Sequence, residues 1–204
     1  RTFVSDLLAS SHDANVVYAA FDNHKLGDFR PYFLRSGDRG RTWTSIASDL
    51  PERGTVYTLA EDPVAPGLLF AGTEFGLWVT VDGGGSWLEL TGGLPTIMVR
   101  DLAIQKRESD LVAATFGRGF YVLDDLSPLR AVSKAALEQA SLVFPVAKAS
   151  LYVPTSLIGA RDKGFLGETY YTGENPPFGA TFTWYLKEGW TSKKDARKKA
   201  EKEA

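Results

Sequence analysis

Short apolar runs separated by turn residues recur along the first 125 residues of the chain. Runs at residues 16–20 and 32–34 are followed by similar runs at 68–71 and 77–79. Each has the length of a short strand and is rich in residues that favour strands. Alternating apolar positions at 56–60 extend the series. This pattern predicts short antiparallel strands joined by tight turns.

An eight-residue motif follows the second apolar run in both repeats. It reads Ser/Thr-x-Asp-x-Gly-x-Ser/Thr-Trp, and its two tryptophans are 44 positions apart (87 − 43). We call the two copies the octets. Their defined residues are Ser36, Asp38, Gly40, Thr42 and Trp43 in the first copy, and Thr80, Asp82, Gly84, Ser86 and Trp87 in the second. Four short strands in about 44 residues match the size of one β-propeller blade.

A third repeat begins at Ile97 but lacks an octet. It has strand-like runs at 111–114 and 120–123, and residues 124–128 stand where the octet would be. The sequence therefore predicts an all-β fold, a partial β-propeller of about three four-stranded blades, with the last one irregular. The expected blade boundaries are residues 1–50, 51–94 and 95–126, which together make up the propeller part, 1–126.

The composition changes after residue 126. We expect 127–153 to be a linker or a blade-completing segment, followed by a β-rich region and a charged C-terminal helix. Asp195 and Lys199, like Arg197 and Glu201, are four residues apart, which supports a solvated helix after Thr191. The other expected elements are a helix-permissive stretch at 133–140, strands at 142–144, 150–153 and 181–186, and a rigid turn at 175–177.

The octets have a local structural explanation. An Asp carboxylate can accept N–H groups of its own turn, a neighbouring hydroxyl adds a bond, and glycine allows positive φ. The tryptophan should bury a large apolar area between sheets. We therefore interpret Asp38 and Asp82 as residues that fasten the hairpin between the third and fourth strands, and not as catalytic acids.

Composition excludes several classes of function. A net charge of −2 gives no electrostatic attraction to nucleic acid or to an anionic membrane surface. The sequence has no apolar run of about 18 residues that would span a membrane. The absence of cysteine excludes a disulfide scaffold and a cysteine-type zinc site. We expect no cofactor and no metal. Because the chain opens on Arg1 within a repeat, we expect it to be a piece of a longer protein.

The octets resemble the Asp-boxes of sialidase-type and sortilin-type propellers. Longer stretches resemble bacterial sortilin-like propeller proteins, often labelled as glycosyl hydrolase or sialidase-like repeat proteins. These stretches are 29–32, 69–77, 93–95, 99–104, 117–125 and 175–180. The resemblance implies a large exported protein, secreted or periplasmic, of which this chain holds the propeller's end and, at 154–204, the start of a β-sandwich-like domain. One position departs from the pattern: Phe116 stands where the family's Thr-His-Gly-Arg-Gly run has its histidine.

Propeller topology predicts where a ligand would bind. Turns between second and third strands lie on the same face as the connections between blades, and the octets lie on the opposite face. On that first face the candidate ligand-binding residues are Asp22, His24, Asp28, Glu74, Arg100 and Arg118. Two alternatives stay open. Arg118 could bridge to Asp124 or Asp101, and the loop with Asp22, His24 and Asp28 could hold a cation or be merely solvated.

Two functions remain. The first is a non-catalytic, sortilin-like binding or scaffold module for a protein, peptide or glycan, with aromatic anchors. The alternative is a glycoside hydrolase, sialidase-like or β-glucanase-like, with its site opposite the octets. The aromatic anchors of a binding module would be Phe21, Phe29, Tyr32, Phe75 and Phe116. The acids of a hydrolase would come from Asp22, Asp28, Glu74 and Asp101. Arg100 and Arg118 would bind the carboxylate of a sialoside, and Tyr32 or Tyr57 would supply a phenol nucleophile. Remaining blades or another chain should cover the outer sheets near 4–7 and 120–122.

Overall fold

The computed structural model describes residues 2–149, 151, 153, 178–189 and 191–203. The chain divides into two compact units, residues 1–138 and 139–204. The expected turn at 175–177, the opening of the β-sandwich at 154 and two residues of the expected strand at 150–153 lie outside the described residues. None of the described helices is long and apolar enough to cross a membrane.

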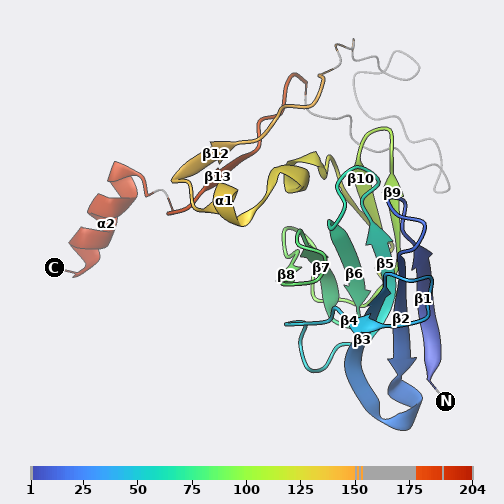
Figure 1. The fold of residues 1–204 in the computed structure, drawn as a ribbon. Coiled ribbons are helices and arrows are strands. Elements are labelled where there is room, and N and C mark those ends of the chain that lie inside the picture. The colour runs from blue at the N-terminus through green and yellow to red at the C-terminus, as the bar shows by residue number, and fades with distance from the viewer. Residues whose placement is uncertain (1, 150, 152, 154–177, 190, 204) are drawn as a thin grey trace, which may run out of the picture. The chain divides into compact units, whose positions relative to one another are not determined.

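The first unit contains three antiparallel sheets that follow one another along the chain (Figure 1). The first sheet has β1 (Phe3–Ala9), β2 (Val17–Asn23), β3 (Asp28–Ser36) and β4 (Thr44–Ser45). The second has β5 (Val56–Glu61), β6 (Leu69–Thr73), β7 (Gly76–Thr80) and β8 (Leu88–Glu89). The third has β9 (Val99–Gln105), β10 (Asp110–Thr115) and β11 (Phe120–Leu123). The predicted fold, a partial β-propeller with an irregular last blade, is confirmed: among the described residues the third sheet has three strands instead of four.

Short helices accompany the strands. A 3₁₀ turn, η1 (His24–Leu26), joins β2 to β3, and η2 (Ser127–Ala131) and α1 (Lys134–Leu137) follow β11. In the second unit β12 (Ser141–Val143) pairs with β13 (Trp184–Leu186), and α2 (Lys193–Glu203) is the predicted charged helix. Within α2, Arg197 and Glu201 approach to 3.2 Å.

The hydrophobic core of the first unit lies between the sheets. One cluster joins the first two sheets through Tyr18, Phe33, Val56, Leu69 and Trp87. A second cluster joins the second and third sheets through Phe70, Leu77, Val79, Val99 and Leu111. Because the second sheet is covered on both faces, all five residues of β6 are buried and its sequence reads as a continuous apolar run.

Polar side chains also link the first two sheets. Asp6 Oδ2 accepts the N–H of Leu59 at 2.9 Å and the Thr58 hydroxyl at 3.1 Å. Glu61 Oε1 accepts hydroxyl groups from Ser10 at 2.9 Å and Tyr18 at 3.0 Å. Burial and the Glu61 charge raise the pKa of Tyr18, so the phenol stays a donor. These bonds fix the register between adjacent blades.

A buried ion pair links η2 to the second sheet. The carboxylate of Asp62 is fully buried and accepts the guanidinium of Arg130 at 2.8 Å. It also accepts the N–H groups of Val64 and Ala65. Burial by itself would raise the pKa of Asp62, but these donors outweigh it and hold the pKa below its ordinary value. Arg130 therefore ties the segment after the third sheet to the turn between β5 and β6.

Each octet closes a hairpin through its aspartate. Asp38 accepts the Ser36 hydroxyl at 2.7 Å and both the N–H and the hydroxyl of Thr42, at 2.8 and 2.7 Å. Asp82 accepts the matching groups of Thr80 and Ser86, at 2.7 to 2.9 Å. The bonds from Thr42 and Ser36 lower the pKa of Asp38 to about 2. The octets therefore act within their own turns.

The two octet tryptophans differ, although both were predicted to be buried. Trp87 is 3% exposed, and its Nε1–H donates to Ile46 O of the first sheet at 2.8 Å, with the Phe33 ring at 5.4 Å. Trp43 is 38% exposed, and its Nε1–H donates to Gly40 O within its own octet. The prediction is wrong for Trp43: Trp87 is buried because it packs on the preceding sheet, and among the described residues no sheet precedes the first.

Gly72 tests the packing between sheets. A Cβ added at Gly72 would lie 2.5 Å from Thr58 Cγ2 and 2.8 Å from Val99 Cγ1. We expect Gly72→Ala to lower the free energy of unfolding by about 1–3 kcal/mol, as overpacking of a core does. Gly92→Ala is the control, because a Cβ there meets nothing within 4 Å. Urea titration of both variants measures the effect; equal stabilities would contradict the packing described.

Asp38 should make stability depend on pH. Its folded pKa lies below the ordinary value, so its contribution is present above about pH 4 and is lost as pH falls towards about 2. We expect Asp38→Asn to be destabilised at neutral pH and to lose less stability than wild type on acidification. Urea unfolding at neutral pH and at about pH 3 measures this difference, with Asp124→Asn, a change at an exposed aspartate, as control. Wild-type stability at neutral pH in Asp38→Asn would refute the role.

Candidate functional site

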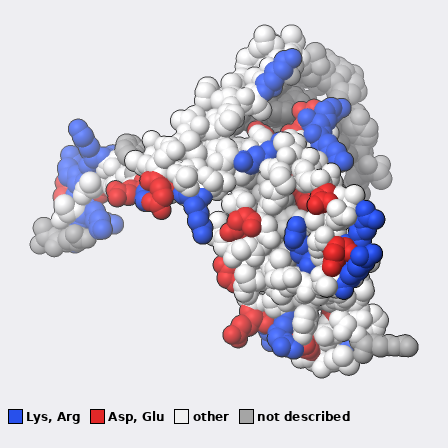
Figure 2. All heavy atoms as spheres, viewed as in Figure 1, with Lys and Arg blue, Asp and Glu red and all other residues white. Residues whose placement is uncertain are grey.

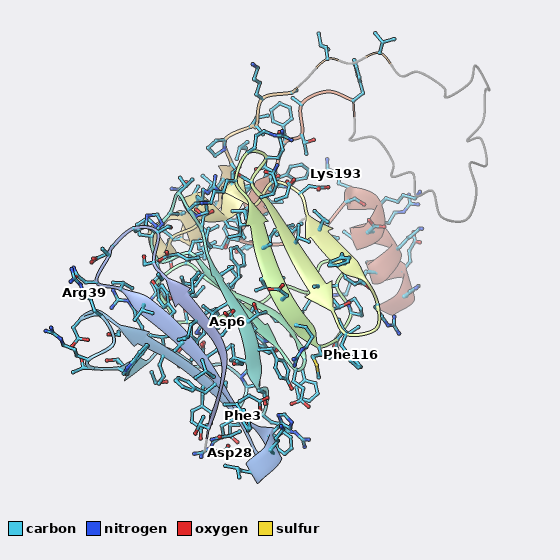
Figure 3. The ribbon with its side chains drawn as sticks, turned by 90° about the vertical axis from the view of Figure 1, so that its right-hand side faces the viewer. Phe3, Asp6, Asp28, Arg39, Phe116 and Lys193 are labelled. Carbon is cyan, nitrogen blue, oxygen red and sulfur yellow. The ribbon has the colours of Figure 1, made fainter. Side chains whose placement is uncertain are left out.

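The strand directions place two sets of loops at opposite ends of the sheets. We call one end the connection face: it holds the turns β2–β3, β6–β7 and β10–β11 and the links between successive sheets. The octet face holds both octets and the turns β1–β2, β5–β6 and β9–β10. Figure 3 labels Asp28 of the connection face and Arg39 of the first octet at opposite ends of the first sheet.

A β-bulge recurs near the start of the first strand of each sheet. The strand registers skip Ser5 in β1, Tyr57 in β5 and Arg100 in β9. A bulge turns one side chain away from the regular alternation. The Ser5 hydroxyl donates to Val56 O at 2.7 Å, and the Arg100 guanidinium lies 4.2 Å from the centre of the Tyr57 ring. The three bulges thus form a row across the sheets on the connection face.

Three of the predicted site residues converge on Tyr57. Burial raises the pKa of this phenol, the charges of Glu74 and Asp22 raise it further, and the charge of Arg100 lowers it. These carboxylates and this guanidinium come from β2, the β6–β7 turn and β9, so they belong to all three sheets. Charged groups of all three sheets therefore act on Tyr57, and Arg100 lies directly over its ring.

Buried polar atoms without a hydrogen-bond partner lie on this face. Among the described residues they are Asn23 Oδ1, Thr55 Oγ1 and Glu74 Oε2. Thr55 is only 1% exposed, and its carbonyl accepts the N–H of Glu74 at 3.0 Å. A buried polar group without a partner is costly, so such groups mark places where a further donor would be favourable.

Two of the predicted acids, Asp22 and Asp28, are already paired. His24 Nδ1 lies 2.6 Å from both carboxylate oxygens of Asp22. Asp28 accepts two bonds from the Arg30 guanidinium, at 3.0 and 2.9 Å, and the Tyr32 hydroxyl at 2.6 Å. These bonds, first those of Arg30, hold the pKa of Asp28 well below its usual range. Asp28 therefore belongs to a separate pair.

Asp22, His24 and Asp28 are the possible ligands of a cation at this loop. The described residues contain no group of three or more His, Asp or Glu side chains that could hold a metal ion. Asp28 is turned towards Arg30 instead of joining Asp22 and His24. The alternative of a cation site at this loop has no support in the geometry.

Arg118 stands apart from the cluster. It is exposed in the β10–β11 turn and forms no hydrogen bond or ion pair with another described residue, so the bridge to Asp124 or Asp101 is not formed. Asp101 Oδ1 accepts the N–H of Leu102 instead. Phe116, in the same turn, is 70% exposed, and Figure 3 places it at the end of the third sheet.

Stacking of cations on aromatic rings was missed by the sequence analysis. Within the described part of the chain, four such pairs occur, and all lie on the connection face. They are Lys25 with Phe3 at 4.5 Å, Arg30 with Tyr32 at 5.5 Å, Arg53 with Phe29 at 4.7 Å and Arg100 with Tyr57 at 4.2 Å. Aligning the three first strands could have flagged Arg100 opposite Tyr57, but Lys25 and Arg53 lie in loops whose contacts the sequence does not reveal.

Two cavities lie away from the candidate residues. One of about 570 Å³ opens on the octet face between the first two sheets and is lined by Tyr18, Arg35, Glu61 and Asp82, among others. Another of about 600 Å³ is lined by residues that include Arg30, Leu50 and Glu52. Neither includes Asp22, Glu74 or Arg100. On the face seen in Figure 2, acidic and basic groups alternate over the first unit.

A comparison with solved structures finds β-propeller proteins. A GH74 enzyme from Niastella koreensis is 20% identical, over 60% of this chain and 21% of its own, with a TM-score of 0.51. The extracellular domain of BT4673 from B. thetaiotaomicron is 17% identical over 61% of this chain and 15% of its own, with a TM-score of 0.46. YCF48 bound to D1 peptide is 18% identical over 56% of this chain and 35% of its own, with a TM-score of 0.41.

This chain thus spans well under half the length of each of these proteins. No family model and no curated protein matches the chain. The likeness to the Niastella koreensis enzyme concerns the fold, and it agrees with the sheets described above: the chain has a β-propeller-like fold.

Titration of Tyr57 tests the geometry of the cluster. We expect its phenol to ionise above the ordinary pKa of tyrosine. Glu74→Gln should lower this pKa because a negative neighbour is removed, and Arg100→Gln should raise it because a positive one is removed. NMR of tyrosine labelled at Cζ, with Tyr57→Phe for assignment, measures both shifts. Shifts of the opposite sign, or none, would contradict the convergence of these groups.

Proposed function

We propose that the first unit is a non-catalytic binding module, sortilin-like in kind, that holds a protein, peptide or glycan partner on its connection face. The observation that carries the proposal is the broad rim of aromatic rings and stacked cations on this face. Phe3, Phe75 and Phe116 are 50%, 40% and 70% exposed there. Aromatic residues and arginine are the side chains most enriched where proteins bind partners.

The carboxylates support binding more than hydrolysis. A glycosidase needs two available carboxyl groups on either side of the bond to be cleaved. Asp28 is engaged by Arg30 and Tyr32, and Asp22 is engaged by His24. Glu74 has a buried oxygen without a partner, and Asp101 is exposed and accepts only the N–H of Leu102. Two of the four candidate acids are therefore engaged by neighbouring side chains, which weakens the case for a pair of available carboxyl groups.

Tyr57 is also a poor candidate for a nucleophile. A sialidase-like reaction needs a reactive phenol with an acid partner and several arginines around a carboxylate. Burial and two neighbouring carboxylates raise the pKa of Tyr57, which disfavours the phenolate. Arg100 lies over the ring, and Arg118 makes no contact with the cluster. The convergence of Asp22 and Glu74 on Tyr57 still favours a glycoside hydrolase as the second candidate function.

The outer faces of the first and third sheets would be covered by further partners in this proposal. Phe3, Val4 and Leu7 of β1 and Phe120 and Val122 of β11 are exposed. Further blades of the same protein, or another chain, would bury them, since a blade buries its apolar faces only against neighbours. The Asp-box resemblance supports a sortilin-like or sialidase-like protein working outside the cytoplasm, secreted or periplasmic.

An array of peptides and oligosaccharides tests the proposed binding. We expect the chain to bind members of the array without turning them over. Phe75→Ala should weaken that binding about tenfold, the loss typical of an exposed aromatic anchor. Val64→Ala is the control, because Val64 is an exposed apolar residue, 62% against 40% for Phe75, but lies in a turn of the octet face. Dissociation constants from calorimetry on the strongest ligand measure the effect.

The opposite outcome is hydrolysis. Products released from a sialoside or a β-glucan oligosaccharide, with activity lost in both Asp22→Asn and Glu74→Gln, would overturn the binding proposal in favour of the hydrolase.

A further inference from the structure

We propose that the partner bound by the connection face presents an acidic peptide segment, whose Asp or Glu side chains are held by Lys25, Arg53 and Arg100. This inference rests on the proposed binding function and specifies its ligand. It starts from three cations of this face that form no ion pair within the described part of the chain, whereas the acids Asp22 and Asp28 are paired.

Two acids of the connection face are paired within the chain, and three of its cations are not. Asp22 is bound to His24, and Asp28 is bound to Arg30. Lys25, Arg53 and Arg100 form no ion pair with any described residue. Their hydrogen-bond donors are therefore available to a ligand, and a carboxylate is the side-chain group that best satisfies them.

Each of these three cations is held against an aromatic ring. The distances to the ring centres are 4.5 Å for Lys25, 4.7 Å for Arg53 and 4.2 Å for Arg100. Stacking of this kind stabilises the position of a long side chain that would otherwise be mobile. A cation already held in place loses less conformational entropy when a ligand binds.

The three pairs belong to one continuous surface. Phe3 lies opposite Asp22 in the β1–β2 register, and Asp22 acts on Tyr57, the ring beneath Arg100. Next to Arg53, the N–H of Gly54 donates to Phe29 O at 2.9 Å, which joins the link between the sheets to β3. The register of β1 with β2 and the bond between Gly54 and Phe29 thus connect the pairs along the connection face.

A peptide fits this surface better than an acidic glycan does. One face of each ring, Phe3, Phe29 and Tyr57, is covered by its cation and is not available to stack on a sugar.

Exposed apolar side chains on the same face agree with a peptide partner. Leu26, Phe75 and Phe116 would contact apolar residues interspersed among the acids. The negative charge of Glu74 should repel the acids of the peptide, because Glu74 and Arg100 both act on Tyr57. Removing that charge should therefore strengthen the binding of an acidic peptide.

The test measures fluorescence anisotropy of a labelled peptide in which Glu and Asp alternate with Leu and Phe. The same peptide with Gln and Asn in place of the acids, and sodium polygalacturonate as an acidic glycan, are the other two probes. The triple variant Lys25→Gln, Arg53→Gln, Arg100→Gln should weaken binding of the acidic peptide at least about tenfold. The same change of charge on the octet face, Arg41→Gln, Lys106→Gln, Arg107→Gln, should change it less than about twofold.

Two further results are expected. Glu74→Gln should bind the acidic peptide more tightly than wild type, and binding should weaken as salt is added. The uncharged peptide should bind no more tightly to wild type than to the connection-face triple variant.

Four results would overturn the proposal. They are no binding of the acidic peptide, equal losses in both triple variants, no loss in the connection-face triple, or polygalacturonate binding through these three cations in preference to the peptide. If a neutral ligand from the array loses affinity in Phe75→Ala but not in this triple variant, the binding function stands and the acidic ligand class fails. Hydrolysis without stable binding would instead remove the binding function itself.

Discussion

Burial between neighbouring sheets is the interaction on which the rest of the first unit depends. A sheet with two apolar faces needs a neighbour on each side, and within the described part of the first unit only the second sheet has both. Its strand β6 is buried at all five positions, whereas three of the four residues of β11 are exposed. The same rule accounts for the octet tryptophans: Trp87 packs on the first sheet, and Trp43 has no sheet to pack on among the described residues. Polar bonds such as those of Asp6 then fix the register that burial permits.

This stacking also separates structural groups from groups available for chemistry. The octet aspartates look like catalytic acids in the sequence, but the carboxylate of each accepts hydrogen bonds from its own turn. At the other end of the sheets, the repeated bulges turn Tyr57 and Arg100 out of the regular alternation and leave them in contact. Regular repeats thus hold the scaffold together, and two of the three bulged positions carry side chains that stack on each other at the connection face.

The sequence predicted what depends on periodicity and local turns. The blade repeat, the octet hairpins and the end of the sheets to which Asp22, Glu74 and Arg100 belong all follow from spacing within one repeat. It could not predict contacts between repeats. The pairing of Asp28 with Arg30 removes one expected acid, and stacking of Arg53 on Phe29 depends on how a link between sheets folds back on β3. The exposure of Trp43 depends on which blades surround the first, which no local pattern encodes.

The central claim is that ligands meet the connection face and not the octet face. Hydrogen–deuterium exchange, measured with and without the strongest ligand of the array, tests it most directly. The turns at residues 23–28, 74–75 and 116–119 should gain protection, and both octets should exchange as before. Protection confined to the octets, or to the cavity lined by Arg35, Glu61 and Asp82, would contradict the claim.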